Sequence, residues 1–226
     1  MEVNSNCDNF ILDRAILKIG FWAGSFAFIA ISAFGIAQSL QILGLLLYPT
    51  DEILIYGFSL CIVVPFLFEI LALYHVTKDE KKFWSHASLI FTIIYAVFVT
   101  ANYVVQLATV IPMTMKGHSN EITILKQTPH SLFWDFDAIG YIAMGLATLF
   151  AVPLFEKKGF QKWVRYSFLF HGLGTPLIAF VYFYPDFSEK LLLIATPWII
   201  TGPLSMLLLA LMFRKIATTA HTQKIQ

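Results

Sequence analysis

The hydrophobic positions of the chain gather in long runs that few charged residues interrupt. A membrane helix needs roughly 20 mostly apolar residues to cross ~30 Å of hydrocarbon. Six runs meet this length, and they predict spans at residues 15–47, 53–75, 84–113, 131–155, 163–184 and 191–213. Each span must be helical, because lipid offers no partner for open backbone N–H and C=O groups. The pattern therefore predicts an all-α fold, a polytopic membrane bundle of six transmembrane helices.

The segments between the runs are short, and none has the composition of a linker between domains. We therefore predict a single transmembrane domain at residues 15–213, with one short tail at 1–14 and another at 214–226. The first and third runs are longer than one crossing requires, so these helices are expected to tilt, kink or extend beyond the membrane.

The composition agrees with a chain that is surrounded by lipid. It is 58% hydrophobic and 13% charged, whereas soluble domains carry about 25% charged residues to wet their surface. The net charge of +1 gives no overall attraction to nucleic acid. The expected partner is the lipid bilayer, and no nucleic acid is expected to bind.

The basic residues are divided unequally between the two sides of the predicted membrane. Twelve of the fifteen Lys and Arg residues fall on one side, and only Lys116, Lys126 and Lys190 fall on the other. Cytoplasmic loops carry the excess of basic residues in membrane proteins. We therefore expect an N-in, C-in protein of the cell membrane, with both termini in the cytosol.

Prolines fall near the middle of three predicted spans. They are Pro65, Pro176 within Gly172-Leu173-Gly174-Thr175-Pro176, and Pro203 within Thr201-Gly202-Pro203. A proline removes one helical hydrogen bond and bends the helix. Three breaks at one level would open a pocket near the bilayer midplane, where transporters often bind substrate. The alternative is plain packing kinks, since proline is frequent in membrane helices.

Two sets of polar residues within the spans are candidates for binding a ligand. His171 shares a helix face with Ser167, Gly174 and Thr175, and this polar stripe lies beside the predicted bend. Asp137 shares a face with Tyr141 and Thr148, whereas Asp135 lies about 200° away around the helix. The alternative places both aspartates at the wet outer interface, where carboxylates cost little. The ligand-binding candidates are His171, Thr175, Thr201, Asn102, Asp137 and Tyr141.

Two further features have structural interpretations. Glu69 and Arg165 are both expected toward the inner face, and a structural ion pair between them would avoid a lone charge at that depth. Gly20 and Gly24 form a GxxxG match. Such a face permits a homo-oligomer, although it more often seats a helix within its own bundle.

The sequence contains no motif that names a reaction. It has no HExxH, no phosphate-binding lysine loop and no cluster of histidines at helical spacing. We therefore assign no catalytic residue, no metal and no cofactor, and an enzyme is not the favoured interpretation. The function expected first is a small carrier or binding protein, a transporter for a largely apolar or lipid-like molecule near the midplane. The alternatives are a membrane-embedded enzyme that uses His171 with a carboxylate, and a packing or assembly subunit without a ligand.

Overall fold

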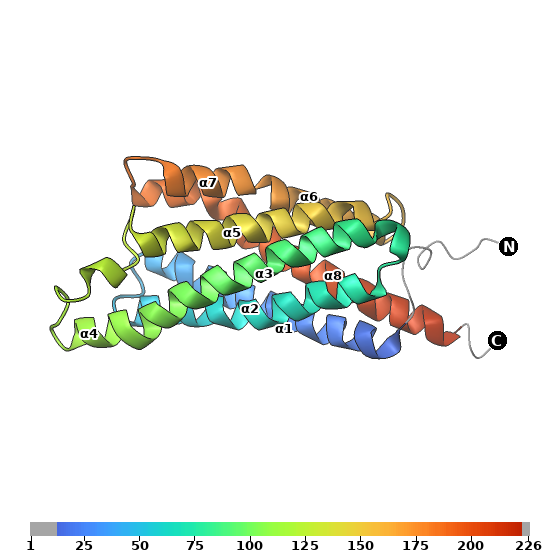
Figure 1. Cartoon of the computed structure of the whole chain (residues 1–226), viewed down its shortest axis with the longest axis horizontal. Helices are drawn as coiled ribbons and strands as arrows, with labels where there is room; N and C mark the ends of the chain where they lie inside the picture. Colours follow the sequence, from blue (N-terminus) through green and yellow to red (C-terminus); the bar gives the residue numbers. More distant parts are fainter. Residues whose placement is uncertain (1–12, 223–226) are drawn as a thin grey trace.

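The computed structural model of the chain describes residues 13–222, and this part of the chain contains helices and no strands (Figure 1). Six of its helical segments are long and apolar enough to cross a membrane: Arg14–Ile42, Thr50–Val76, Asp79–Met115, Leu132–Leu154, Gln161–Phe183 and Lys190–Thr219. The predicted all-α bundle of six spans is confirmed. The chain is a multi-pass integral membrane protein.

The first half of the described chain holds three long helical segments. They are α1 (Arg14–Ile42), α2 (Thr50–Val76) and α3 (Lys82–Val105), and a single 3-10 turn, η1 (Asp79–Lys81), precedes α3. The third segment continues from α3 through a π-helical turn, η2 (Gln106–Val110), into α4 (Ile111–Met115). This continuity explains why the third apolar run is longer than one crossing requires.

The second half contains the remaining three spans. Its elements are η3 (Thr123–Leu125), α5 (Leu132–Ala151), η4 (Val152–Leu154), α6 (Gln161–Leu173), α7 (Thr175–Phe183), η5 (Glu189–Ala195) and α8 (Thr196–Thr222). Helix α8 extends nine residues beyond the predicted span end at 213, so most of the tail predicted at 214–226 is helical. Residues 1–12 of the predicted N-terminal tail and residues 223–226 lie outside the described part of the chain.

Only one of the three predicted proline breaks interrupts a helix. The fifth span is divided at Gly174 into α6 and α7, as expected, and Pro176 lies in the first turn of α7. A proline is tolerated there because its missing N–H would have no helical partner. By contrast, Pro65 lies inside α2 and Pro203 inside α8, and both helices continue past them. The prediction of three breaks at one level is therefore wrong.

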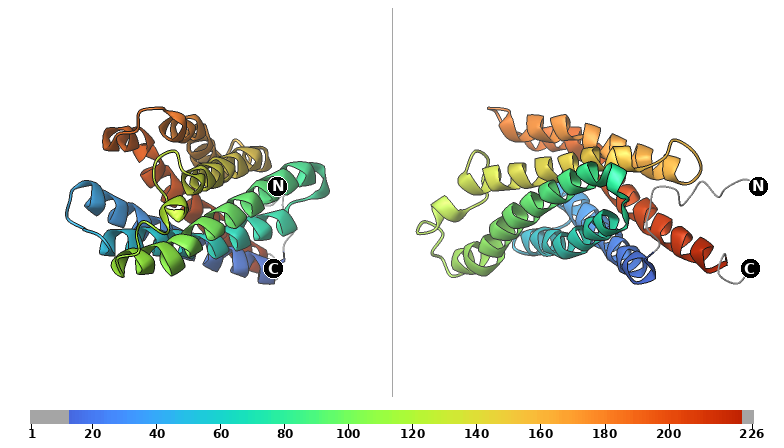
Figure 2. Two further views of the ribbon diagram at one scale, coloured as in Figure 1. Left: turned by 60° about the vertical axis from the view of Figure 1, so that its left-hand side comes forward. Right: turned by 45° about the vertical axis from the view of Figure 1, so that its right-hand side comes forward.

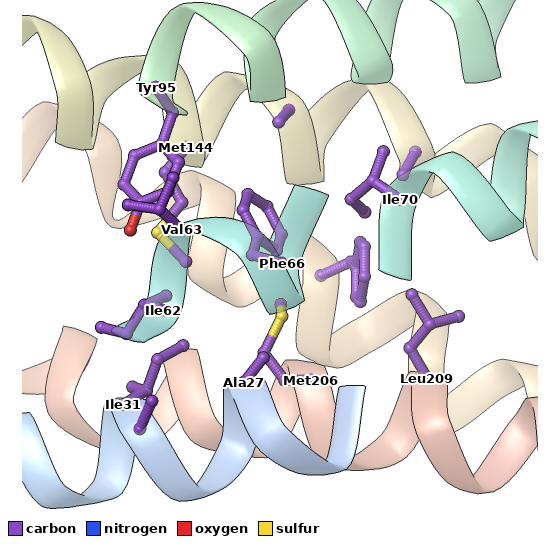
Figure 3. Packing of buried hydrophobic residues seen from close by; sticks show 14 of the residues in the cluster. Ala27, Ile31, Ile62, Val63, Phe66, Ile70, Tyr95, Met144, Met206 and Leu209 are labelled. Atoms are coloured by element: carbon purple, nitrogen blue, oxygen red, sulfur yellow. The ribbon is translucent and has the colours of Figure 1, made fainter. Parts of the chain in front are cut away.

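Packing explains why α2 continues through its proline. Ile62 and Phe66, on either side of Pro65, are fully buried in the core. Figure 3 shows both side chains among Ile31 of α1 and Met206 of α8. Since both halves of the helix are held by these contacts, the loss of one backbone hydrogen bond does not break it.

The six spans form a closed ring in chain order. Helix α1 packs on α2, α2 on α3, α3 on α5, α5 on α6 and α7, α6 on α8, and α8 returns to α1. Figure 1 places the start of α1 and the end of α8 at one end of the bundle, and Figure 2 shows α3 crossing it diagonally. The turn at 43–49 and the segment 116–131 lie at the opposite end, here called the distal end.

The GxxxG face of α1 is buried inside this ring. A Cβ added at Gly20 would lie 2.6 Å from the ring of Phe213 in α8, and one added at Gly24 would collide with Oε1 of Glu69 in α2. The two glycines therefore let α1 approach α2 and α8 closely. The face that we considered for a homo-oligomer is covered by the chain's own helices.

Candidate functional site

Asp137 is the buried carboxylate of the distal half of the bundle. Helix α5 begins after Ser131, whose hydroxyl accepts a hydrogen bond from the backbone N–H of Trp134 at 3.2 Å and so caps the helix. This start places Asp135 on the exposed surface and leaves Asp137 only 4% exposed. The two side chains thus lie on opposite faces of α5, Asp137 toward the bundle and Asp135 toward the outside.

Four neutral side chains donate hydrogen bonds to the carboxylate of Asp137. Its Oδ1 accepts from the Tyr103 hydroxyl at 2.6 Å and from Nδ2 of Asn102 at 3.2 Å. Its Oδ2 accepts from Nε2 of Gln127 at 3.0 Å and from the Tyr182 hydroxyl. These donors come from α3, from the segment before α5 and from α7. A buried carboxylate is tolerated when its lone pairs are satisfied in this way.

The segment 116–131 is held against α3 by amide hydrogen bonds. Gln106 donates from Nε2 to the carbonyl of Leu125 at 2.8 Å and accepts from the backbone N–H of Gln127 at 3.2 Å. Asn102 donates to Oε1 of Gln127 at 3.0 Å. Gln106 is the first residue of the π-helical turn, and such turns often occur at functional sites. The turn thus helps to place Gln127 beside Asp137.

A pocket lies on the other side of this hydrogen-bond network. It has a volume of about 110 Å³, and α1, α5, α7, η5 and α8 supply its walls. Its lining is mostly aliphatic and aromatic: Phe34, Gln38, Ile42, Tyr141, Ile178, Val181, Tyr182, Leu192, Ala195, Thr196, Trp198 and Ile199. Tyr182 both lines the pocket and binds Asp137, so the carboxylate network forms part of the pocket wall.

The break at Gly174 makes room for this pocket. Helix α6 packs on α8, whereas α7 packs mainly on α5 and η5. The indole N–H of Trp134 in α5 donates to the carbonyl of Tyr182 at 3.1 Å and ties α7 to α5. The change of direction at Gly174 therefore takes α7 away from α8, and the pocket occupies the space between them.

Trp198 connects the pocket with His171. Its ring makes edge contacts with Phe34 and Tyr141, at centroid distances of 5.5 and 5.2 Å, and lies 5.9 Å from the ring of His171. Nδ1 of His171 lies 3.1 Å from the hydroxyl of Thr201, which itself donates to the carbonyl of Pro197. The hydroxyl proton is thus committed, so Nδ1–H of His171 is the donor and Nε2 is left as an acceptor.

Buried polar atoms without a partner gather around Trp198. Among the described residues, Nε2 of His171 and Nε1 of Trp198 have no hydrogen-bond partner, and the two rings lie 5.9 Å apart. Buried polar groups are normally paired with protein or ordered water. A water or ligand beside these two atoms would therefore gain hydrogen bonds.

The structure brings most of the predicted candidates into two connected groups. Asn102, Asp137 and Tyr141 belong to one network, in which the hydroxyls of Tyr141 and Tyr103 lie 3.2 Å apart. His171 and Thr201 form the second group, and Trp198 contacts both groups. Thr175 lies apart from these hydrogen bonds, with its hydroxyl against Gly145 of α5.

The sequence did not single out Tyr103, Gln127, Tyr182 or Trp198. Tyrosine hydroxyls inside apolar runs were a usable signal, because a buried hydroxyl needs a partner. Gln127 gave no signal of this kind, since it lies in a loop whose docking depends on contacts distant in sequence.

The predicted ion pair between Glu69 and Arg165 is wrong. Both carboxylate oxygens of Glu69 are buried and have no hydrogen-bond partner in the described part of the chain. The guanidinium of Arg165 instead donates to the carbonyls of Val152 and Phe155, at 2.7 and 3.0 Å. These carbonyls end the preceding span, so the arginine caps that span and Glu69 packs against Gly24.

No protein-family model, no curated protein and no solved structure matches this chain. Within the described residues, no group of three or more His, Cys, Asp or Glu side chains could hold a metal ion. A proposal about function therefore rests on the geometry of the pocket and of the Asp137 network.

Proposed function

We propose that this integral membrane protein binds a small, largely apolar molecule in the pocket between α1, α5, α7 and α8. The observation that carries the proposal is the combination of an aromatic, mostly apolar lining with a few polar groups held in place by Asp137. Ligand sites generally have this composition, with a small number of fixed polar groups that orient the ligand. The same pocket lies beside the unpaired atoms of Trp198 and His171.

The volume limits what the pocket can enclose. Its 110 Å³ is below the roughly 300–1,000 Å³ of sites for drug-sized ligands. It is closer to the ~150 Å³ cavity that accommodates benzene. The pocket thus fits a single ring or a short stretch of hydrocarbon chain, and the rest of a longer molecule would lie outside it.

A carrier role is supported by the divided fifth span. A carrier must open its site, and hinges commonly lie at the ends of helices. Gly174 separates α6, which packs on α8, from α7, which supplies Ile178, Val181 and Tyr182 to the pocket. Movement of α7 about Gly174 would change access to the pocket without disturbing the α6–α8 contact.

The enzyme alternative has less support. His171 uses Nδ1 to bind Thr201, and no carboxylate is among its hydrogen-bond partners in the described chain. Asp137 is already surrounded by four donors. An acid–base pair needs both groups within hydrogen-bond reach of one substrate atom, so binding is the better interpretation.

The first experiment tests the pocket by filling it. Ala195 lines the pocket, and the Ala195→Phe substitution would add a ring to it. In lipid nanodiscs, 6-bromohexan-1-ol is expected to quench tryptophan fluorescence in a saturable manner, because bromine would lie near Trp198. Ala195→Phe should weaken this saturable quenching at least tenfold.

The matched control is Ile200→Phe, since Ile200 is 71% exposed on α8. 6-Bromohexan-1-ol should quench the tryptophan fluorescence of this variant as strongly as that of the unmodified protein. Absence of saturable quenching, or equal quenching in the Ala195→Phe protein, would refute a ligand site in this pocket.

We also propose that the distal end faces away from the cytosol in the cell membrane. The unequal distribution of Lys and Arg supports this orientation. A reporter enzyme that works only in the cytosol should be active when fused at Lys81, Lys158 or Lys215, and inactive at Lys116. Activity at Lys116 together with silence at Lys158 would reverse the orientation.

A further inference from the structure

We infer that the ligand of the pocket is an apolar molecule that carries a hydroxyl group, which donates a hydrogen bond to the acceptor oxygens of Tyr182 and Gln38 in the wall. This inference rests on the proposed binding function and deepens it. The basis is the direction of the hydrogen bonds that the polar lining residues already make, because these bonds decide which lining atoms can still accept.

Asp137 fixes the direction of the first hydrogen bonds. An ionised carboxylate only accepts, and its four partners can all donate. The single hydroxyl proton of Tyr182 therefore points at Oδ2 of Asp137 and away from the pocket. The oxygen of Tyr182 keeps its lone pairs, so on the pocket side this residue can only accept.

Tyr141 is oriented by the same carboxylate through one more step. Tyr103 donates its proton to Oδ1 of Asp137, at 2.6 Å. The hydrogen bond between the hydroxyls of Tyr103 and Tyr141, at 3.2 Å, must therefore be donated by Tyr141. The oxygen of Tyr141, a residue that lines the pocket, therefore keeps an acceptor, and Oγ of Ser59 lies 3.5 Å from it.

The other two polar lining residues lead to the same result. Thr196 donates its hydroxyl proton to the carbonyl of Leu193 at 2.7 Å. Gln38 donates from Nε2 to Gln41 at 2.7 Å, and Gln41 in turn donates to Asp51 at 2.8 Å. This chain leaves the carbonyl oxygen of Gln38 as a further acceptor and the second hydrogen of its Nε2 as a donor. Two buried carboxylates, Asp137 and Asp51, thus orient Tyr182 and Gln38 so that each keeps an acceptor oxygen.

A wall of acceptors selects a ligand that donates. An ether, an ester or a carboxylate would place its own lone pairs against those of the tyrosines, and a buried acceptor left unpaired is unfavourable. Trp198 and Gln38 are the exceptions, because the buried Nε1–H of Trp198 has no partner in the described residues and Gln38 keeps a second amide hydrogen. A hydroxyl group can both donate and accept, whereas an ammonium group only donates. The lining therefore favours an alcohol.

The inference is tested with four bromohexyl compounds that share one chain and differ in the head group. They are 6-bromohexan-1-ol, 1-bromo-6-methoxyhexane, 6-bromohexylammonium and 6-bromohexanoate. Saturable quenching of tryptophan fluorescence in nanodiscs gives the affinity of each. The alcohol is expected to bind roughly tenfold more tightly than the ether, and more tightly than the ammonium compound or the carboxylate.

Variants show whether the tyrosine oxygen causes the preference. Tyr182→Phe should reduce the ratio of alcohol to ether affinity toward one, because the ring stays and the acceptor is lost. Tyr184→Phe is the matched control, since Tyr184 is 40% exposed and does not line the pocket. If Tyr182→Phe unfolds the protein, Gln38→Met removes another acceptor and should lower the same ratio.

The outcomes separate this inference from the proposed function. If the ether, the ammonium compound or the carboxylate binds as tightly as the alcohol, and Ala195→Phe still weakens binding, the pocket is a site but the hydroxyl assignment is wrong. If no compound shows quenching that Ala195→Phe weakens, the proposed function fails as well. Retention of the full preference in both Tyr182→Phe and Gln38→Met would also refute the inference.

Discussion

Asp137→Asn is expected to lower the free energy of unfolding by about 2–4 kcal/mol, since hydrogen bonds to a charged acceptor are each worth ~1.5–3 kcal/mol. The substitution replaces one acceptor oxygen by an NH₂ group. Each carboxylate oxygen of Asp137 receives two donors, one of them a tyrosine hydroxyl. In either orientation of the new amide, its NH₂ group would therefore face the two donors that bound the replaced oxygen. Thermal unfolding of the purified protein in nanodiscs measures the effect.

Asp135→Asn is the control for this substitution. It makes the same chemical change two residues away on the same helix, at a side chain that is exposed. Its unfolding temperature should stay within a degree or two of the unmodified protein, because surface substitutions change stability by ~0.5 kcal/mol or less. Equal unfolding temperatures for the two variants would show that the Asp137 network contributes nothing to stability.

The network also predicts a link between stability and binding. Asp137→Asn frees the tyrosine hydroxyls from a fixed acceptor, so the protons of Tyr182 and Tyr141 can turn toward the pocket. The preference for an alcohol over an ether should then decrease even in protein that remains folded. One carboxylate would thereby hold the segment 116–131 in place and set the polarity of the pocket.

The spans and several residues of the site could be predicted from the sequence, for physical reasons. A segment that crosses hydrocarbon must be apolar and must satisfy its own backbone hydrogen bonds. The six apolar runs were therefore expected to be helices. The break at Gly174 followed from the Gly-Leu-Gly-Thr-Pro sequence. The polar face of α5 favoured Asp137 over Asp135 as the buried carboxylate, and the structure places it there.

The rest of the site depends on contacts that no local pattern encodes. Gln127 reaches Asp137 because Gln106, in a π-helical turn, binds the loop that carries it. Tyr182 and Trp198 are ordinary aromatic residues of membrane helices until α7 turns away from α8 and exposes them to one pocket. Which side chains meet is decided by the order in which the six helical spans pack against one another.

Glu69 shows where a general rule failed. Charges in membranes usually pair, and Arg165 was the basic residue expected at a similar depth. Arg165 instead donates hydrogen bonds to the backbone carbonyls at the end of the fourth span. Glu69 remains between α1 and α8, close to Gly24 and Ala210, and packing there is tight enough to be tested.

Gly24→Ala is expected to destabilise the protein. The added Cβ would collide with Oε1 of Glu69 and lie 2.9 Å from Cβ of Ala210, so α1 would have to move away from both α2 and α8. Overpacking of this kind typically costs about 1–3 kcal/mol, which exceeds the gain of ~1 kcal/mol from replacing glycine by alanine in a helix. A lower thermal unfolding temperature is the expected result.

Gly57→Ala provides the matched control, because nothing lies within 4 Å of a Cβ added at Gly57 in α2. It should leave the unfolding temperature unchanged or raise it, by helix propensity alone. Combining Gly24→Ala with Glu69→Ala removes the carboxyl group that the new methyl meets. The double variant should therefore unfold at a higher temperature than Gly24→Ala alone, which makes the two changes non-additive. If Gly24→Ala matches Gly57→Ala, or if Glu69→Ala gives no rescue, then Glu69 does not pack against this face of α1.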